Sequence, residues 1–270
     1  MLHEVIDIQV KGSLPNTKLY TYFLDNSPEI NLEGTRPVIV ICPGGGYSMT
    51  SDREAEAIAV KFLSMGYHAA VLRYSCSPAV YPTALLELAA VVKMLRENAK
   101  QWHIDKDKII IQGSSAGGHL AASMGVFWKE DFIAQYFNCD SELLKPNALI
   151  LNYPVITSGE FAHRDSFHKL LGDRYNELLS KMSLEQQVTN DTPKSFLWHT
   201  FTDDCVPVEN SLLFVMALKD KNIPTEFHMY PVGGHGLGLA TKETACPNGY
   251  GIQEECKSWI PLVETWLKNI

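Results

Sequence analysis

A serine with small neighbours occupies the run 113–117, which reads Gly-Ser-Ser-Ala-Gly and fits the pattern G-x-S-x-G. The run follows a short apolar stretch typical of a strand and precedes an alanine-rich stretch typical of a helix. On such a sharp turn a nucleophile adopts strained backbone angles, so the residues two places before and after it must be small. The two glycines of the run meet this requirement for Ser115, whereas Ser114 would have Gln112 at one of those positions. We therefore predict that Ser115 is a nucleophile.

A serine hydroxyl needs a base to act as a nucleophile near neutral pH, and the base needs an acidic partner. Both residue types follow in loops directly after predicted strands, at the edge of a parallel sheet where catalytic groups gather. Asp203 lies after one strand and His235 after the next, so we predict these residues as the acid and the base. Asp204 is the alternative acid, and its competing role is to cap the helix that starts near Pro207.

Four other histidines compete with His235 for the role of base. Each lies where histidine is more often a packing or hydrogen-bonding residue than a catalytic one. His228 falls inside a predicted strand, His119 on the helix after the serine turn, His103 near a helix end and His199 at a strand end. None of them lies in a glycine-rich loop like the one that holds His235.

A glycine triplet follows an early predicted strand, in the run 42–47 that reads Cys-Pro-Gly-Gly-Gly-Tyr. Glycine lets backbone amides turn toward a ligand without obstruction, so this loop is a candidate anion site with Gly45 and Gly46 as donors. The amide of Ala116, at the start of the helix after Ser115, is a further candidate donor. Phosphate is the competing ligand, but the G-K-[ST] sequence of phosphate-binding loops does not follow.

A parallel sheet must bring these loops to one edge, and the pattern of the chain predicts such a sheet. Short apolar runs alternate with amphipathic stretches from residue 37 onward, as in an α/β fold whose sheet is covered on both faces. The predicted strands are 38–41, 68–72, 109–111, 148–151, 195–199 and 226–230. The predicted helices are 51–65, 82–99, 116–128, 208–220 and 251–267. Two earlier strands, 4–10 and 18–23, are expected to form a hairpin.

One charged stretch, 156–191, interrupts this alternation and contains helix-like runs at 166–171 and 175–182. We interpret the stretch as an insertion over the top of the sheet that acts as a lid. No repeat, low-complexity tract or linker divides the 270 residues, so we predict a single domain.

The composition argues against several classes of partner. Lysine and arginine total 23 against 31 acidic residues, and without a basic cluster the chain is not suited to nucleic acid or anionic lipid. No uncharged apolar run reaches the roughly 18 residues that span a membrane. The first residues do not form a secretory signal, so we expect a cytoplasmic protein. The six cysteines lack C-x-x-C spacing, so we expect reduced thiols, no metal site and no Cys246–Cys256 disulfide.

Four motifs together resemble those of the α/β-hydrolase esterases: the glycine loop 43–47, the serine turn 113–120, the acid loop 199–207 and the histidine loop 233–236. The order serine, aspartate, histidine also matches that fold. More narrowly, residues 38–270 resemble the bacterial acetyl esterases, including acetylxylan esterase-like sugar hydrolases. Two positions depart from relatives, because Pro43 replaces a histidine of the hormone-sensitive-lipase group and Thr200 replaces a common glycine.

The resemblance implies a serine esterase that works by two-step acyl transfer without a metal or an organic cofactor. In that scheme Ser115 attacks the ester carbonyl, His235 shuttles the proton and Asp203 orients the histidine. The oxyanion hole would be formed by three backbone amides, those of Gly45, Gly46 and Ala116.

We expect a small-molecule ester with a short acyl group as the substrate, with acetyl on a sugar as the first candidate, because the resemblance points there and the long apolar lid of a lipase is missing. Four residues that follow strand ends are candidates for the pocket wall and equally for the core: Tyr47, Met49, Tyr153 and Val206. An amidase or peptidase on the same fold and a non-catalytic binding protein remain alternatives. The sequence does not indicate the oligomeric state, and a homodimer is simply the commonest outcome for soluble enzymes.

Overall fold

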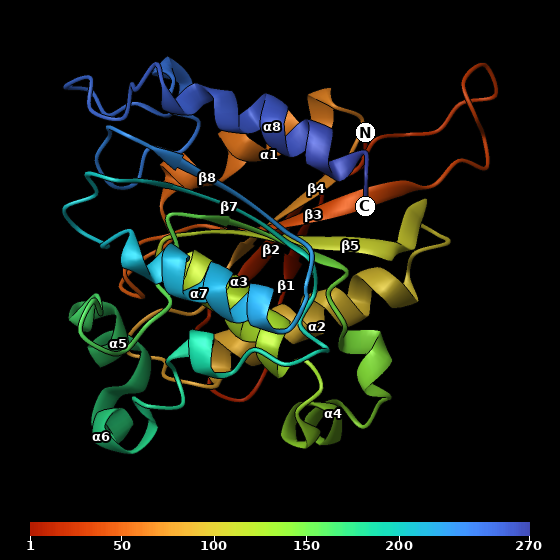
Figure 1. Ribbon diagram of the computed structural model, residues 1–270. Helices are drawn as coiled ribbons and strands as arrows, with labels where there is room; N and C mark the ends of the chain where they lie inside the picture. Colours follow the sequence, from red (N-terminus) through yellow and green to blue (C-terminus); the bar gives the residue numbers. More distant parts are fainter.

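The computed structural model describes residues 1–270 and has an eight-stranded, mostly parallel sheet at its centre (Figure 1). The strands lie in the order β1-β2-β4-β3-β5-β6-β7-β8. β1 pairs with β2 and β2 with β4 in antiparallel fashion, whereas all other neighbours are parallel. The strands are β1 (Val5–Asp7), β2 (Lys18–Tyr22), β3 (Arg36–Cys42), β4 (His68–Arg73), β5 (Ile104–Ser114), β6 (Ala148–Asn152), β7 (Ser195–Thr200) and β8 (Thr225–Tyr230). The predicted α/β class and the hairpin at the start are both confirmed.

Helices cover both faces of the sheet, with α1 and α8 on one face and α2, α3 and α7 on the other (Figure 1). Because side chains alternate along a strand, a continuous apolar run such as β3 needs cover on both sides. Val38 and Val40 belong to the larger hydrophobic core, and Ile39 and Ile41 belong to the smaller core. The helices are α1 (Glu56–Ser64), α2 (Thr83–Glu97), α3 (Ala116–Phe127), α4 (Asp131–Phe137), α5 (Arg164–Leu171), α6 (Tyr175–Leu178), α7 (Glu209–Asp220) and α8 (Trp259–Leu267).

Two of the predicted helices begin later than expected. The predicted helix 51–65 is divided at Ala55, whose φ of -115° and ψ of -106° separate a short 3₁₀ turn, η1 (Asp52–Glu54), from α1. The predicted helix 251–267 starts only at Trp259, because Gly251 has a φ of +100° that an α-helix does not contain. The sequence reading also missed α4, which has seven residues and is too short to show a clear helical period.

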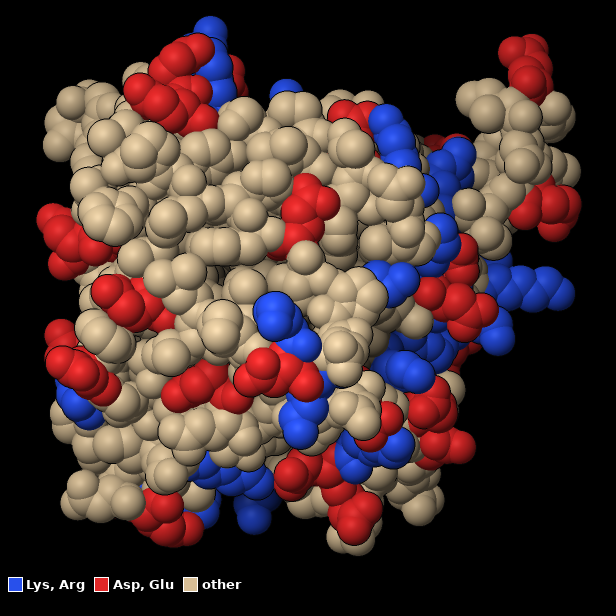
Figure 2. Space-filling model, viewed as in Figure 1, with Lys and Arg blue, Asp and Glu red and all other residues tan.

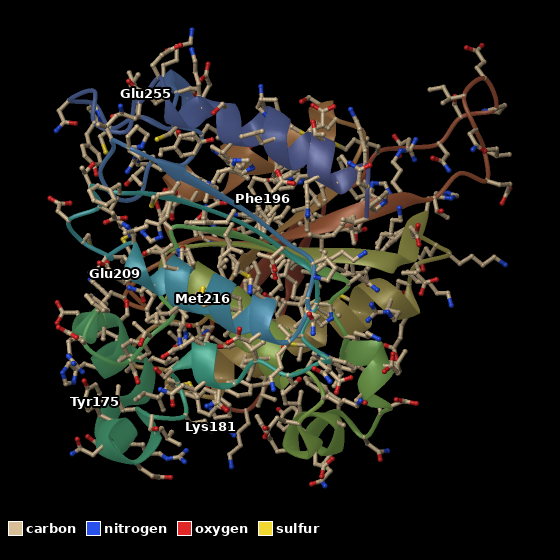
Figure 3. All side chains as sticks on the ribbon, viewed as in Figure 1. Tyr175, Lys181, Phe196, Glu209, Met216 and Glu255 are labelled. Carbon is tan, nitrogen blue, oxygen red and sulfur yellow. The ribbon has the colours of Figure 1, made fainter.

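The segment 156–191 lies between β6 and β7 and contains α5 and α6. The predicted helix 166–171 is present within α5, whereas the predicted helix 175–182 ends at Leu178. α6, which carries Tyr175, lies on the same side of the molecule as the start of α7 at Glu209 (Figure 3). The segment is firmly packed, because Phe167 and Leu171 of α5 are buried in the larger core.

The surface carries charges of both signs. On the face seen in Figure 2, basic and acidic side chains are interspersed and no large basic patch covers the surface. None of the helices combines the length and the apolar character that crossing a bilayer requires. All six cysteines are free thiols, and no cluster of three histidine, cysteine or acidic side chains is arranged to hold a metal ion.

Candidate active site

Ser115 lies on the sharp turn between β5 and α3, where its backbone has a φ of 54° and a ψ of -122°. This conformation is strained for a residue with a side chain and persists only where the surroundings enforce it. The small neighbours that the sequence pattern demanded are indeed required. A Cβ on Gly117 would lie 2.1 Å from the carbonyl oxygen of Cys42, and a Cβ on Gly113 would lie 2.2 Å from the carbonyl oxygen of Gly117.

The three residues predicted as nucleophile, base and acid form one hydrogen-bonded line. His235 Nε2 lies 2.7 Å from Ser115 Oγ, and His235 Nδ1 lies 2.7 Å from Asp203 Oδ2. The carboxylate accepts from Nδ1–H, which leaves Nε2 free to accept the serine proton. The loops after β7 and β8 supply the acid and the histidine, so the parallel sheet brings together residues that are far apart in the sequence.

The carboxylate of Asp203 is fully enclosed and heavily hydrogen-bonded. Oδ1 accepts the backbone amides of Cys205 and Val206, each at 2.9 Å. Burial opposes ionisation of this group, but hydrogen bonds from His199 and His235 outweigh burial and hold the pKa of Asp203 well below its usual range. The carboxylate is therefore charged at neutral pH and can stabilise an imidazolium.

The alternative acid, Asp204, is exposed and takes no part in this line. It does not cap the next helix either, because Val208 is the N-cap of α7 and no side chain bonds there. The predicted preference for Asp203 over Asp204 agrees with the positions of both residues.

The competing histidines do not reach Ser115. His119 and His199 are buried hydrogen-bonding residues, as the sequence reading expected. His119 contacts the Tyr47 hydroxyl and the carbonyl of Met182, at 2.9 and 3.1 Å. His228 pairs with Glu226 on β8, which lies at the edge of the sheet.

The glycine loop after β3 reaches the nucleophile. Gly45 and Gly46 have φ values of 132° and 63°, and their amides donate to no other backbone group of the protein. Both residues line a cavity of about 240 Å³ together with Ser115 and His235. Ala116 is the first residue of α3, where amides lack partners within the helix and the helix dipole favours negative charge. The arrangement can accept an oxyanion beside Ser115.

Three of the four predicted pocket residues are corrected by the structure. Met49 lines the cavity with Ser115, but Tyr47, Tyr153 and Val206 do not. All three are buried, with exposed fractions of 3%, 1% and 0%. The tyrosine hydroxyls bond to His119 and Glu54, and the Val206 amide bonds to Asp203. These residues support the cavity from behind.

Several residues that line the same cavity were not predicted from the sequence, among them the polar side chains of Arg53, Glu54 and His163. Arg53 and Glu54 come from η1, and His163 comes from the segment 156–191. His163 Nδ1 bonds to Ser166 Oγ at 2.8 Å. Burial lowers the pKa of His163 below 6.5, so its ring is mostly neutral at pH 7. No local motif marked these residues, because their position depends on how separate elements pack.

A larger groove of about 880 Å³ lies elsewhere, between α1 and α8. Its walls include Val60, Ile260 and Pro261, and none of the residues of the hydrogen-bonded line reaches it. The smaller cavity is the candidate active site, because Ser115 and His235 line it.

A mostly parallel sheet in this strand order, a serine on the strand-to-helix turn after β5, and an acid and a histidine after later strands define the class of α/β-hydrolases. Within this class, residues 26–218 match the BD-FAE family. The match covers most of the chain, which therefore belongs to that family.

The chain is similar to a protein named as a xylanase and to one named as an acetylxylan esterase. It is 37% identical over 239 residues to endo-1,4-beta-xylanase B of Butyrivibrio fibrisolvens, covering 86% of the chain and 36% of that protein. It is 29% identical over 210 residues to the acetylxylan esterase of Xylanibacter ruminicola, covering 75% of the chain and 41% of that protein. The chain thus spans well under half the length of both relatives.

A solved structure resembles the chain over almost its entire length. This is the acetyl ester-xyloside bifunctional hydrolase from Caldicellulosiruptor lactoaceticus, with 36% identity and a TM-score of 0.80. The alignment covers 94% of the present chain and 88% of the other. The predicted resemblance to acetyl esterases and sugar hydrolases is confirmed.

Proposed function

We propose that this chain is a serine carboxylesterase that hydrolyses short-chain acyl esters, in particular acetyl esters of sugars. The observation that carries the proposal is the unbroken line from Ser115 Oγ through His235 to Asp203, with 2.7 Å at each step. A serine placed in this way is activated by the histidine and needs no external base.

In the proposed reaction Ser115 Oγ attacks the ester carbonyl carbon while His235 Nε2 takes the serine proton. The tetrahedral intermediate collapses, the alcohol leaves with that proton and the acyl group stays on Ser115. His235 then takes a proton from a water molecule, which attacks the acyl-enzyme. The second tetrahedral intermediate collapses, the carboxylic acid leaves and His235 returns the proton to Ser115 Oγ. Asp203 stays ionised throughout and stabilises the imidazolium.

The oxyanion of each tetrahedral intermediate would be held by the amides of Gly45, Gly46 and Ala116. Two features support this assignment: the free amides of the glycine loop and the N-terminal position of Ala116 on α3. Amides that are fixed before the reaction stabilise the developing charge without reorganising.

An ester of a small acyl group with a sugar hydroxyl agrees with the volume of the cavity and with the names of the similar proteins. About 240 Å³ is below the roughly 300 Å³ at which pockets for drug-sized ligands begin. Of the three similar proteins described above, two are named for acetyl esters and all three for xylan or xylosides, the xylose-based carbohydrates. Acetylated xylose units are therefore our first choice of substrate.

We also propose that the chain is a single domain in which segment 156–191 is a lid that forms the alcohol side of the pocket. Of the residues that line the cavity, only His163 comes from this segment. An added Cβ on Gly46 would lie 3.9 Å from Ser166 Oγ, so the segment also reaches the glycine loop.

The proposal is tested by hydrolysis of p-nitrophenyl esters from acetate to decanoate, with the wild type and Ser115→Ala. We expect activity to be highest with acetate and to vanish in the variant. Activity that rises toward decanoate would contradict the short acyl preference. Activity confined to aminoacyl p-nitroanilides would indicate an amidase, and no activity with a folded wild type would favour a binding protein.

The cytoplasmic location and the homodimer remain predictions, to be tested by cell fractionation and by size-exclusion chromatography.

A further inference from the structure

Glu54 is a buried carboxylate beside the catalytic cavity that the proposed reaction does not use. It ends the 3₁₀ turn η1 and is only 3% exposed. A carboxylate in such a place is costly unless its oxygens are hydrogen-bonded. Each oxygen of Glu54 has one donor, and the two donors belong to different parts of the candidate active site.

The first oxygen holds the glycine loop. Glu54 Oε2 accepts the backbone amide of Gly44 at 2.8 Å. A Cβ on Gly44 would lie 2.6 Å from Glu54 Oε2 and 2.9 Å from Ser115 Cβ, so the loop is confined between the carboxylate and the nucleophile. Gly45 and Gly46, the proposed oxyanion donors, follow directly in the chain. A shift of the Glu54 carboxylate would therefore displace them.

The second oxygen holds the histidine loop through a tyrosine. Glu54 Oε1 accepts the hydroxyl of Tyr153 at 2.6 Å, and the same hydroxyl accepts the amide of Gly238 at 2.9 Å. Burial, and then the charge of Glu54, raise the pKa of Tyr153 well above 10, so the phenol stays protonated and donates. The Tyr153 ring also packs edge-on against the His235 ring, with 5.1 Å between centroids and 70° between planes.

We propose that Glu54 is a positioning residue that fixes the glycine loop and the catalytic histidine relative to each other. It holds the glycine loop directly and the histidine through Tyr153. This role rests on the proposed ester hydrolysis. The reaction needs the oxyanion amides and His235 on opposite sides of one acyl carbon, and misplacement by about 1 Å can lower the rate about 100-fold. Glu54 is the only side chain that we find bonded both to the glycine loop and to the group that supports the histidine loop.

The test compares Glu54→Gln, Tyr153→Phe and the double variant with the wild type, by measuring kcat and KM for p-nitrophenyl acetate. Gln keeps the shape of Glu54 but can accept from only one of its two donors. We expect kcat to fall about 10- to 100-fold for Glu54→Gln and less for Tyr153→Phe, with KM within about 3-fold of wild type. The double variant should lose less than the product of the single losses, since both variants break one shared bond.

The matched control is Glu56→Gln, because Glu56 lies two residues away, is exposed and faces away from the cavity holding Ser115. Its kcat should stay within about 2-fold of wild type, as is usual for surface substitutions. A Glu54→Gln protein with wild-type kcat and a lowered melting temperature would overturn the positioning role and leave a structural one. A rise in KM of about 10- to 100-fold in Glu54→Gln, with kcat unchanged, would overturn the positioning role as well. If wild type and Glu56→Gln were both inactive on esters, the proposed function would fail, and the role of Glu54 with it.

Discussion

His199 Nε2 lies 3.3 Å from Asp203 Oδ2, the same oxygen that accepts the hydrogen bond from His235. The His199 ring is itself held by Ser211 Oγ at 2.8 Å and by the Val206 carbonyl at 2.9 Å. Two imidazoles thus converge on one buried carboxylate oxygen, one from the reacting side and one from the protein interior. The Nε2–H of His199 is shared between the Val206 carbonyl and this oxygen, and together with His235 it holds the pKa of Asp203 low.

Replacement of His199 by Phe should therefore weaken both the fold and the reaction. Loss of this donor lets the pKa of Asp203 rise toward its usual value, and hydrogen bonds to charged groups are worth about 2 kcal/mol. We expect the free energy of unfolding at pH 7 to fall by about that amount and kcat to fall about 10-fold. Urea titration and ester kinetics measure the two effects. His228→Phe, on the edge strand β8, is the control and should change neither by much.

Asp203→Asn should be far more damaging than Asp204→Asn, although the two aspartates are adjacent. The amide at position 203 can hold the wrong tautomer of His235, and the equivalent change in another serine hydrolase lowers kcat about 10,000-fold. We expect a loss of about 1,000- to 10,000-fold for Asp203→Asn. Asp204 is exposed, so its variant should keep activity within about 2-fold. Similar losses in both variants would refute the assignment of the acid.

His163→Ala should change the choice of substrate more than the chemistry. His163 lines the cavity and its Nδ1 is held by Ser166, so Nε2 is the ring nitrogen that we assign to the alcohol part of the ester in the proposed pocket. A sugar hydroxyl can form a hydrogen bond with this nitrogen, whereas the p-nitrophenyl group provides no comparable hydrogen-bonding partner. We expect kcat/KM to fall about 3- to 10-fold for a monoacetylated xyloside and to stay nearly constant for p-nitrophenyl acetate. An equal loss on both esters would argue against a role in binding the alcohol.

Stability should decrease in weak acid because of His119. Burial lowers the pKa of this histidine from 6.5 to about 4. The unfolded chain therefore binds a proton between about pH 6.5 and pH 4 that the folded chain does not, and folding weakens as the pH falls through this window. The contribution is about 3 kcal/mol by pH 4. His119→Gln should be less stable than wild type at pH 7, and urea titrations should show this difference shrinking toward pH 4.5. A constant difference would contradict the account.

The sheet and the candidate triad could be predicted because local patterns encode them. The spacing of Gly113 and Gly117, with the apolar run before them and the alanine-rich run after them, indicated the nucleophile turn. The predicted acid and base each lay in a loop directly after a predicted strand. The pocket walls could not be predicted in this way. Tyr153 follows β6 in sequence just as a pocket residue would, yet its φ of 37° turns the ring behind the cavity toward Glu54. Such a position depends on the contact between Tyr153 and Glu54 of η1, which are far apart in the sequence, and no local pattern records it.

The central claim is that Ser115 is an activated nucleophile, and covalent labelling tests it most directly. A fluorophosphonate probe reacts with a serine only when a neighbouring base and an oxyanion site activate it. Intact-protein and peptide mass spectrometry of the folded wild type should show one added group, located on Ser115, and none on Ser115→Ala. A folded wild type that stays unlabelled, or that carries the group on another residue, would contradict the account.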